Sequence, residues 1–535
     1  MGMVVAPQAM AADIGAQVLE AGGNAIDAAV TVAFVQGVLD PLNCGLGGFG
    51  CMVTYSAQAG KWQALSFHAR AGALSSEAMW ADLTEEQYVR GADGFRLKDY
   101  VNDIGYRSIA TPGTVAGLAA ALGQLGTKDW RSTIEPAVPF ALDGYRVTPK
   151  ARTLFKRSLS QVGPHPAMRG TATVAARSIF TSDGHTPWQE GDLFVQEDYG
   201  RTLLRLADLG ADDFYRGGLG DQMADDIGTG GGFVTRRDLR DYEAKWQEPL
   251  VGSYRGYKVV TAPPPACGVT LLEMLQVAER FELGQFDHNS PKHLDVVARI
   301  MRWAYRDRAL YVADPDFSPV PVGWLLSAER TNEAQRAIER ADEIIVPRWA
   351  PIETGTTHIC VADRNGNLVS LTHTLGAASG VVTTGLGFVY NNAMNGFDPI
   401  PGRPNSIAPA KSRVTGMTPT VLDDGAGSQV IVGAPGGEMI TNAVFQVVSN
   451  IVDFGMSATE AVSATRVDCR GEVIEVEARL PEKTCAGLVA RGNTVLKSAA
   501  SYWTHPLVQV ITIDAPKNAI DGGSDPRGEG AAVWE

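Results

Sequence analysis

The segment from residue 355 to residue 374 constrains the fold of this chain more than any other. Two β-rich runs, TTHICVAD at 356–363 and NLVSLTHT at 367–374, flank the short sequence Arg364-Asn365-Gly366. A three-residue loop that ends in glycine is typical of a β-hairpin, because glycine accepts the positive φ that such a turn needs. If Asp363 faces Asn367, Thr356 faces Thr374, and a two-residue Asn-Gly turn would shift this pairing by only one position. The sequence therefore predicts that the two threonines are neighbours.

Thr356 also follows the small residue Gly355, and this order suggests a chemical function. A threonine hydroxyl is a poor nucleophile unless a base lies beside it, and the free α-amino group of an N-terminal threonine can be that base. Self-cleavage between Gly355 and Thr356 would create such an amino group, with Thr374 as a second hydroxyl for proton handling. The alternative is an ordinary sheet, in which threonine pairs across strands are common.

A second element supports this chemistry. Residues 428–434 (SQVIVGA) predict a buried strand, Pro435-Gly436-Gly437 a tight turn, and the residues from Glu438 onward a helix. Backbone N–H groups at a glycine turn that opens a helix favour negative charge. The N–H groups of Gly436 and Gly437 are therefore candidates for the oxyanion hole that acyl transfer requires. A plain strand-to-helix connection would also explain two glycines.

Sequence blocks spread over almost the whole chain resemble the gamma-glutamyltranspeptidase family. In the family's order they are EAGGNAIDAAV at 20–30, PGTVAG at 112–117, YRGYKV at 254–259, APPPACG at 262–268, TTHICVADRNGNLVSLTHTLG at 356–376, the paired Asn391-Asn392, MTPT at 417–420, GAPGG at 433–437 and SDPRGEG at 524–530. The resemblance implies an N-terminal-nucleophile hydrolase with an α+β fold, a four-layer αββα sandwich, made as a precursor that cleaves itself. It also implies that Thr356 is the nucleophile, that Thr374 contacts it, and that Gly436 and Gly437 are the oxyanion donors.

Cleavage before Thr356 would divide the chain into residues 1–355 and residues 356–535, a fragment of 535 − 355 = 180 residues. We expect these two fragments to stay associated as one interleaved domain, with a higher oligomer left open. No Ser-, Gly- or Pro-rich tract and no fixed-period repeat separates parts of the chain. Helical and strand patterns alternate throughout, as in a predicted helix at 11–38 followed by a strand at 51–55.

Composition excludes several classes of protein. The formal net charge of −14 would repel phosphate backbones, and no basic cluster offsets it, so nucleic acid is not an expected partner. No apolar run approaches the length of a membrane span. The first basic residue is Lys61, so we expect a cytoplasmic protein, or a periplasmic or secreted one if a signal peptide has been removed. Six scattered cysteines without CxxC spacing predict buried free thiols.

Two further patterns have plainer explanations than a cofactor or a metal. Residues 45–50 (GLGGFG) match the dinucleotide fingerprint, but a helical run precedes them and a strand follows, the reverse of what that fingerprint needs. Close backbone packing beside the sheet is the plainer explanation. His358 and His373 could lie near each other across the hairpin, but a zinc site would need a third ligand. We therefore expect neither a metal nor a cofactor.

The substrate pocket is where the sequence departs from the family. Typical members hold the gamma-glutamyl group with an Arg, an Asn, a Gln, an Asp and a pair of serines. The corresponding positions here are His68, Gly376, Ala393, Gly396 and Thr415-Gly416, and the lid segment 392–411 is shorter than usual. Loss of several contacts to a charged head group should make gamma-glutamyl compounds poor substrates, since removing one partner of a buried charge pair costs about 2–5 kcal/mol.

The resulting hypothesis is a self-processing amidohydrolase that cleaves a different small acyl amide through an acyl-enzyme. Candidate pocket residues are His68, Arg70, Gly376, Asn392, Arg413, Thr415 and Gly416. Arg70 and Arg413 flank the altered segments, and an arginine fork suits a substrate carboxylate. Two alternatives remain open: a true gamma-glutamyl hydrolase or transferase that uses these arginines, and a non-catalytic binding protein on the same fold.

Overall fold

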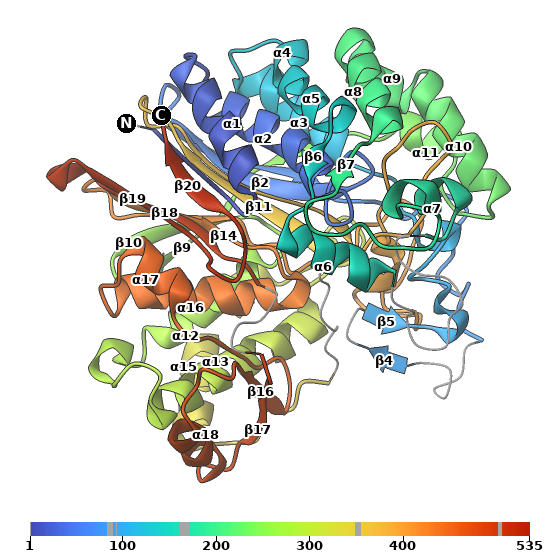
Figure 1. The fold of residues 1–535 in the computed structure, drawn as a ribbon. Coiled ribbons are helices and arrows are strands. Elements are labelled where there is room, and N and C mark those ends of the chain that lie inside the picture. Colours follow the sequence, from blue (N-terminus) through green and yellow to red (C-terminus); the bar gives the residue numbers. More distant parts are fainter. Residues whose placement is uncertain (1, 83–88, 92–93, 160–170, 348–354, 501–505) are drawn as a thin grey trace.

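Two β-sheets packed face to face lie between two layers of helices in the computed structural model (Figure 1). The structure describes residues 2–82, 89–91, 94–159, 171–347, 355–500 and 506–535. The predicted α+β class and four-layer αββα sandwich are confirmed by this architecture.

The two central sheets are antiparallel in every pairing of their strands. The first has the strand order β20 (Ala531–Trp534), β1 (Met3–Ala6), β11 (Gly355–Ala362), β12 (Leu368–Gly376), β2 (Phe49–Ser56), β3 (Lys61–Phe67) and β8 (Lys245–Gln247). The second has the order β19 (Ala519–Ser524), β18 (Gln509–Asp514), β14 (Ser428–Gly433), β13 (Thr420–Asp423), β10 (Tyr257–Thr261) and β9 (Leu250–Tyr254). Both sheets thus contain strands from either side of Gly355.

Side-chain alternation along each strand builds three apolar layers. On β11, Ile359 and Val361 face the first helix layer, whereas Cys360 and Ala362 face the second sheet. A third cluster lies between the second sheet and its own helices. Because of this alternation, Thr356 lies on the inter-sheet side of β11 and Thr357 on the helix side.

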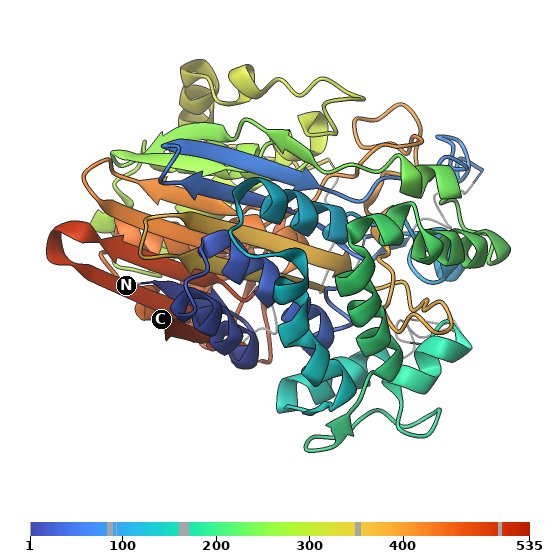
Figure 2. The same cartoon turned by 90° about the horizontal axis from the view of Figure 1, so that it is seen from above.

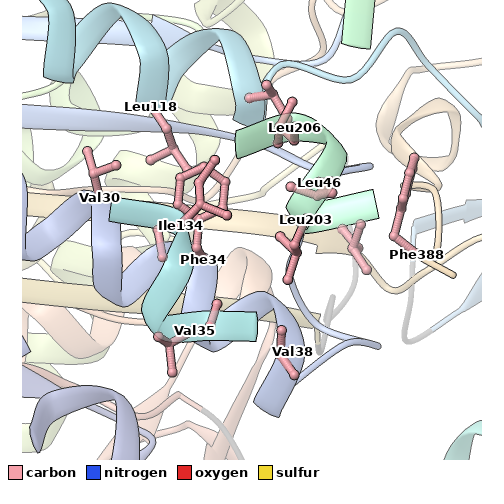
Figure 3. Packing of buried hydrophobic residues seen from close by; sticks show 14 of the residues in the cluster. Val30, Phe34, Val35, Val38, Leu46, Leu118, Ile134, Leu203, Leu206 and Phe388 are labelled. Carbon is pink, nitrogen blue, oxygen red and sulfur yellow. The ribbon is translucent and has the colours of Figure 1, made fainter. Parts of the chain in front are cut away.

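The first outer layer rests on helices α1 (Ala9–Glu20), α2 (Ala25–Leu39) and α3 (Thr114–Leu125). Buried residues of α2, such as Val30, Phe34 and Val38, pack with Leu118 of α3 and Leu203 of α8 (Glu197–Leu209) (Figure 3). The layer continues through α4 (Trp130–Ile134), α5 (Val138–Leu142), α6 (Pro149–Ser158), α7 (Val174–Phe180), α9 (Ala211–Tyr215), α10 (Gly218–Thr229) and α11 (Arg236–Arg240). The green helices α8 to α11 lie to the right in both overall views (Figures 1 and 2).

The prediction of one continuous helix at 11–38 is wrong, because the structure has two helices there, α1 and α2. Gly22 has φ +80°, a conformation in which glycine ends a helix at little cost. Asn24 then caps α2, accepting from the N–H of Asp27 while the Asp27 carboxylate accepts from the Asn24 N–H. The first-strand prediction at 51–55 lies within β2.

The second outer layer contains α12 (Gly268–Ala278), α13 (Pro291–Tyr311), α14 (Val322–Leu325), α15 (Ala328–Glu339), α16 (Ile440–Val452), α17 (Ala458–Ser463) and α18 (Glu482–Val489). Smaller sheets pair β4 (Val89–Gly91) with β5 (Gly94–Arg96), β6 (Tyr145–Arg146) with β7 (Leu193–Phe194), and β16 (Val473–Val476) with β15 (Val467–Asp468) and β17 (Thr494–Lys497). The described helices include none that is both long and apolar enough to span a membrane.

Candidate active site

The hairpin of β11 and β12 brings the two predicted threonines together. Thr357 pairs with His373, and the N–H of Asp363 donates to the carbonyl of Asn367 at 3.1 Å, as the first of the two predicted registers requires. Gly366 has φ +85°, so its predicted role in the turn is confirmed. The pairing shifts between Gly355 and Thr357, and Thr356 occupies the irregular position. Its Oγ1 lies 2.9 Å from Oγ1 of Thr374, so the two are neighbours as predicted.

Both hydroxyls lie at the peptide carbonyl of Gly355. Thr356 Oγ1 is 2.8 Å from this oxygen, and the Thr374 hydroxyl donates to it as well. The N–H of Gly376 donates to Thr374 Oγ1 at 2.8 Å, which fixes the Thr374 side chain. Thr356 is only 3 % exposed. Hydrogen bonds to a carbonyl oxygen stabilise the charge that develops there during nucleophilic attack, so this arrangement suits attack on the Gly355–Thr356 peptide bond.

The glycine turn after β14 has the backbone that only glycine adopts readily. Gly436 has φ +136° and Gly437 has φ +56°. The predicted strand is β14, whereas the helix predicted from Glu438 begins as a 3-10 turn at Gly437–Met439 before α16. Among the described residues, none accepts a hydrogen bond from the N–H of Gly436 or Gly437. These N–H groups are therefore open to an acceptor from outside the part of the chain that the structure describes.

Contacts between the two sheets relate this turn to the hydroxyl pair. The Cys360 thiol contacts the carbonyl of Ile431, and a Cβ on Gly433 would lie 2.2 Å from the ring of His358. Moving two residues back along β11 therefore corresponds to moving two residues forward along β14. One further step leads to Thr356 and Pro435, so the glycine turn lies at the end of the strands that carries the hydroxyl pair.

A buried ion pair holds the far side of the glycine turn. The carboxylate of Glu438 pairs with the guanidinium of Arg308, and the Tyr305 hydroxyl donates to the Glu438 carbonyl. Arg308 also donates to the Cys267 thiol at 2.8 Å. Burial opposes its charge, but Cys267 and Glu438 raise the pKa of Arg308 above its usual range. Sequence reasoning missed these residues, since only the fold brings α13 to this turn.

His68 and Thr415, two of the predicted pocket residues, are in contact. His68 Nε2 lies 3.3 Å from Thr415 Oγ1, and His68 Nδ1 lies 2.9 Å from Ser66 Oγ. Burial, and next the nearby charges of Arg413 and Arg70, lower the pKa of His68 to about 3, so the imidazole is neutral at physiological pH. Gly416 packs against the glycine turn, because a Cβ there would lie 2.0 Å from the Gly437 carbonyl.

Arg413 occupies space that Gly396 leaves open, and it lies beside Gly376. A Cβ on Gly396 would lie 2.1 Å from its Nη1, and a Cβ on Gly376 would lie 3.7 Å from its Nη2. The guanidinium carbon is 5.4 Å from the ring centroid of Phe49, and the residue is 2 % exposed. Gly376 pairs with Gly355, the residue before Thr356, so the buried Arg413 guanidinium lies at the same end of the hairpin as the hydroxyl pair.

Arg70 and Asn392 make other contacts. The Arg70 guanidinium donates to the carbonyl of Glu243 at 2.7 Å and stacks on Tyr242, 4.6 Å from its ring centroid. The Asn392 amide accepts from the N–H of Ala377 at 2.7 Å and donates to the Asp103 carboxylate at 2.8 Å. Asn392 therefore stabilises the chain just after β12 through Ala377. Its contact with a substrate stays a prediction.

Two cavities of about 280 Å³ each adjoin these residues. The first is lined by residues that include Gly396, Val414 and Glu438, next to Arg413 and the glycine turn. The second contains His68 and Arg70, together with Lys245 and Asp316. The structure thus separates Arg70 from the first cavity, whereas the neighbours of Arg413 line it.

The other sequence patterns have structural explanations. His358 and His373 lie at adjacent positions across the hairpin, as suggested, but their side chains project to opposite faces of the first sheet: His358 contacts Thr372, and His373 contacts Gln36. In the glycine-rich segment, a Cβ on Gly47 or Gly48 would lie within 2.5 Å of the Val389 or Thr374 carbonyl, which explains the glycines by close packing. All six cysteines are buried free thiols, as predicted. The described part of the chain contains no group of three or more His, Cys, Asp or Glu placed to hold a metal ion.

Comparisons with known proteins agree with this geometry. The Gamma-glutamyltranspeptidase family matches residues 11–534. The acylase ACY 1 proenzyme of Pseudomonas sp. (strain V22) is 32% identical, with 100% of this chain and 92% of the relative covered. The glutathione hydrolase proenzyme of Escherichia coli (strain K12) is 31% identical, with 98% and 90% covered. The crystal structure of cephalosporin acylase from Bacillus halodurans has a TM-score of 0.87 at 28% identity and covers 100% of this chain and 96% of its own.

A fold of this kind, with a hydroxyl pair at the start of β11 and a glycine turn at the end of β14, therefore agrees with the match over nearly the whole sequence. The chain belongs to the gamma-glutamyltranspeptidase family and is an amide hydrolase or transpeptidase.

Proposed function

We propose that the chain is a precursor that cleaves itself between Gly355 and Thr356. In this step Oγ1 of Thr356 attacks the Gly355 carbonyl carbon, the C–N bond breaks, and the hydroxyl proton passes to the nitrogen of Thr356. This step frees the Thr356 amino group and leaves Gly355 esterified to Oγ1, and water then hydrolyses the ester to give a Gly355 carboxylate and the Thr356 hydroxyl. The single observation that carries this proposal is the contact of both hydroxyls with the Gly355 carbonyl oxygen.

The same hydroxyl then acts on the substrate. The Thr356 α-amino group, whose reference pKa is about 7.7–8.0, takes the hydroxyl proton, and Oγ1 attacks the amide carbon. The N–H groups of Gly436 and Gly437 stabilise the oxyanion. The amine leaves with the proton, and water releases the acyl group and regenerates the hydroxyl. Fragments 1–355 and 356–535 stay associated because both sheets contain strands of each.

The proposed substrate is an amide whose acyl group bears a carboxylate and no α-amino group. Gly376 and Gly396 align with the family's Asn and Asp, and Arg413 occupies the space beside both. An acidic side chain suits an ammonium group, whereas a buried guanidinium suits a carboxylate. An arginine beside the positions of the family's Asn and Asp should therefore favour a carboxylate at this end of the pocket. Two relatives named as acylases, acylase ACY 1 and the cephalosporin acylase, support hydrolysis of an acyl amide.

Three matched anilides test the proposal. Glutaryl-4-nitroanilide carries the carboxylate alone, gamma-glutamyl-4-nitroanilide carries both head groups, and pentanoyl-4-nitroanilide carries neither. We expect the glutaryl compound to have the highest kcat/KM by absorbance of released 4-nitroaniline. A gamma-glutamyl preference would instead identify a gamma-glutamyl hydrolase or transpeptidase, like the glutathione hydrolase relatives. Mass spectrometry of a rapidly quenched reaction should find the acyl group on the 356–535 fragment.

Self-cleavage separates these enzymes from a binding protein. Fresh protein should resolve into two bands on a denaturing gel, and the smaller should begin at Thr356 by N-terminal sequencing. An uncleaved chain without turnover of any anilide would favour the non-catalytic alternative.

A further inference from the structure

A chain of buried side-chain hydrogen bonds runs from the hydroxyl hairpin to a carboxylate at the end of α2. His373 Nε2 lies 2.9 Å from Gln36 Oε1, and Gln36 Nε2 donates to Gln8 Oε1 at 2.7 Å. Gln8 Nε2 then donates to Asp40 Oδ2 at 2.8 Å. Gln36 and His373 are completely buried. The residues come from β12, α2 and the residue before α1, so this series of hydrogen bonds runs from the helix-facing side of the first sheet into its helix layer.

The carboxylate determines the direction of every bond in this chain. Both oxygens of Asp40 accept hydrogen bonds, one from Gln8 and the other from Asn43, whereas an amide side chain has a donor end and an acceptor end. Burial raises the pKa of Asp40, and the nearby charge of Lys150 and these two hydrogen bonds oppose that rise. Gln8 must therefore present its N–H₂ to Asp40 and its oxygen to Gln36. Gln36 in turn presents its oxygen to His373. His373 must then carry its proton on Nε2, and its buried Nδ1 has no partner among the described residues.

This series of hydrogen bonds contacts the hairpin on both sides of the hydroxyl pair. His373 precedes Thr374 and is the cross-strand partner of Thr357, the residue after Thr356. The Thr357 hydroxyl also contacts Gln8 Oε1 at 3.5 Å. On the other side of Thr374, the N–H of Leu375 donates to the carbonyl of Asn43 at 2.8 Å. The Asn43 side chain donates to Asp40 Oδ1 at 2.7 Å. The hydrogen bonds on both sides of Thr374 therefore lead to the Asp40 carboxyl group.

We propose that Asp40 is a positioning residue for acyl transfer, which fixes the His373 tautomer through Gln8 and Gln36 and thereby holds Thr356 and Thr374 in register. This inference rests on the proposed function for its effect on rate, and the tautomer is its independent part. Asp40 touches neither substrate nor the reacting atoms. It acts as a hydrogen-bond acceptor, not as a charge, because it is connected to the hairpin only through amide groups.

Replacement of Asp40 can be designed so that the fold survives. Asp40 lines a cavity of about 560 Å³ between α1, the end of α2 and α6, which gives a leucine side chain room to turn. Asp40→Leu removes the acceptor. Asp40→Asn keeps an oxygen for Gln8, and the Asn43 amide can turn over to accept from the new N–H₂, because its Oδ1 has no partner among the described residues. Gln36→Met removes the amide group in the middle of the hydrogen-bond series, between His373 and Gln8.

Three measurements test the proposal on the full chain: the rate of precursor self-cleavage, kcat and KM for glutaryl-4-nitroanilide, and the His373 tautomer by ¹⁵N NMR of histidine-labelled protein. His373→Gln assigns the signal. For Asp40→Leu and Gln36→Met we expect both rates to fall roughly 10-fold, since small misplacements of reacting groups are costly, with little change in KM. The His373 signal should lose its single Nε2–H form, and Asp40→Asn should restore both the rate and the tautomer.

Asp27→Asn is the matched control, because Asp27 is a buried carboxylate at the other end of α2 that caps the helix. It should lower the melting temperature without changing the tautomer. Parent rates in both Asp40→Leu and Gln36→Met would overturn the proposal. So would an Asp40→Asn variant as slow as Asp40→Leu, or slow variants that keep the His373 tautomer. If Thr356 is not the nucleophile, the tautomer changes remain as predicted while the rates do not follow them.

Discussion

The hydroxyl hairpin and the pocket beside it differ in what holds them in place. The hydroxyl pair contacts main-chain groups, namely the Gly355 carbonyl and the Gly376 N–H, and the glycine turn offers two further main-chain N–H groups. The residues predicted for the substrate pocket are side chains such as His68, Thr415 and Arg413, which contact one another or lie beside the two cavities. Catalytic contacts made by main-chain groups depend on the backbone conformation, and many different sequences can adopt the same conformation. A pocket made from side chains changes with single substitutions.

The two glycines beside Arg413 show how such a change fits the packing. Because protein interiors are close-packed, a large buried side chain can enter only where other atoms have left. A side chain at Gly396 would collide with the Arg413 guanidinium, so the glycine and the arginine depend on each other. The difference between the two regions therefore predicts that catalysis is lost through the hairpin and the turn, whereas substrate choice changes through Arg413.

The largest effect should come from Thr356→Ala. Without the hydroxyl, neither self-cleavage nor acyl transfer can begin, and loss of a nucleophile costs on the order of 10⁴-fold or more in rate. We expect one band on a denaturing gel and no release of 4-nitroaniline. Thr356→Ser is the control, because it keeps a hydroxyl and should still cleave itself. Full activity of an uncleaved Thr356→Ala chain would refute the proposed nucleophile.

The glycine turn should give the next largest effect. Valine at Gly436 would be strained at φ +136°, and its Cβ would lie 2.6 Å from Pro506, so this variant tests folding as much as catalysis. Gly437, at φ +56°, is in the left-handed region that other residues enter at a cost of about 1–2 kcal/mol. Gly437→Ala should therefore fold and lose roughly 10²–10³ in kcat if its N–H turns away from the oxyanion. Near-parent kcat in a folded Gly437→Ala protein would place the donors elsewhere.

The sequence predicted the parts of the molecule that depend on local patterns. The hairpin register follows from Gly366 and the β-rich runs, and the glycine turn follows from the strand before it. The break between α1 and α2 was also encoded locally, in Gly22 and the Asn24–Asp27 capping box, but the continuous apolar pattern hid it. These features need only neighbouring residues.

Contacts between distant segments could not be predicted in the same way. Arg70 and Arg413 looked equivalent in sequence, and only the fold directs Arg70 to Glu243 and Arg413 to Gly376. Phe49, which stacks under Arg413, lies more than 300 residues away in the chain. The hydrogen bonds from Asp40 to His373 could not be predicted for the same reason, because these residues become neighbours only when α2 packs on β12.

Arg413→Met should reduce the preference for an acidic acyl group. A hydrogen bond to a charged group contributes about 1.5–3 kcal/mol, so kcat/KM for glutaryl-4-nitroanilide should fall about 10- to 100-fold. The value for pentanoyl-4-nitroanilide should change little. Arg70→Met is the matched control, since Arg70 binds Glu243 and Tyr242 and should leave both values within about twofold. Equal losses for the two anilides, or a larger loss in Arg70→Met, would contradict a carboxylate contact at Arg413.

The smallest effect concerns pH and separates the two regions once more. The Thr356 amino group must be unprotonated to accept the hydroxyl proton, so kcat/KM should rise with pH through its pKa, near the reference range of about 7.7–8.0. His68 cannot produce this rise, because burial and the two nearby arginines lower its pKa to about 3 and leave it neutral throughout. His68→Gln keeps a polar group for Thr415 and should change kcat/KM by less than roughly threefold, since a neutral hydrogen bond contributes only about 0.5–1.5 kcal/mol. Its pH profile, measured from pH 5 to pH 9, should coincide in shape with that of the parent. A shifted or missing inflection would mean that His68 takes part in the proton transfer, and the pocket would then belong to the catalytic machinery.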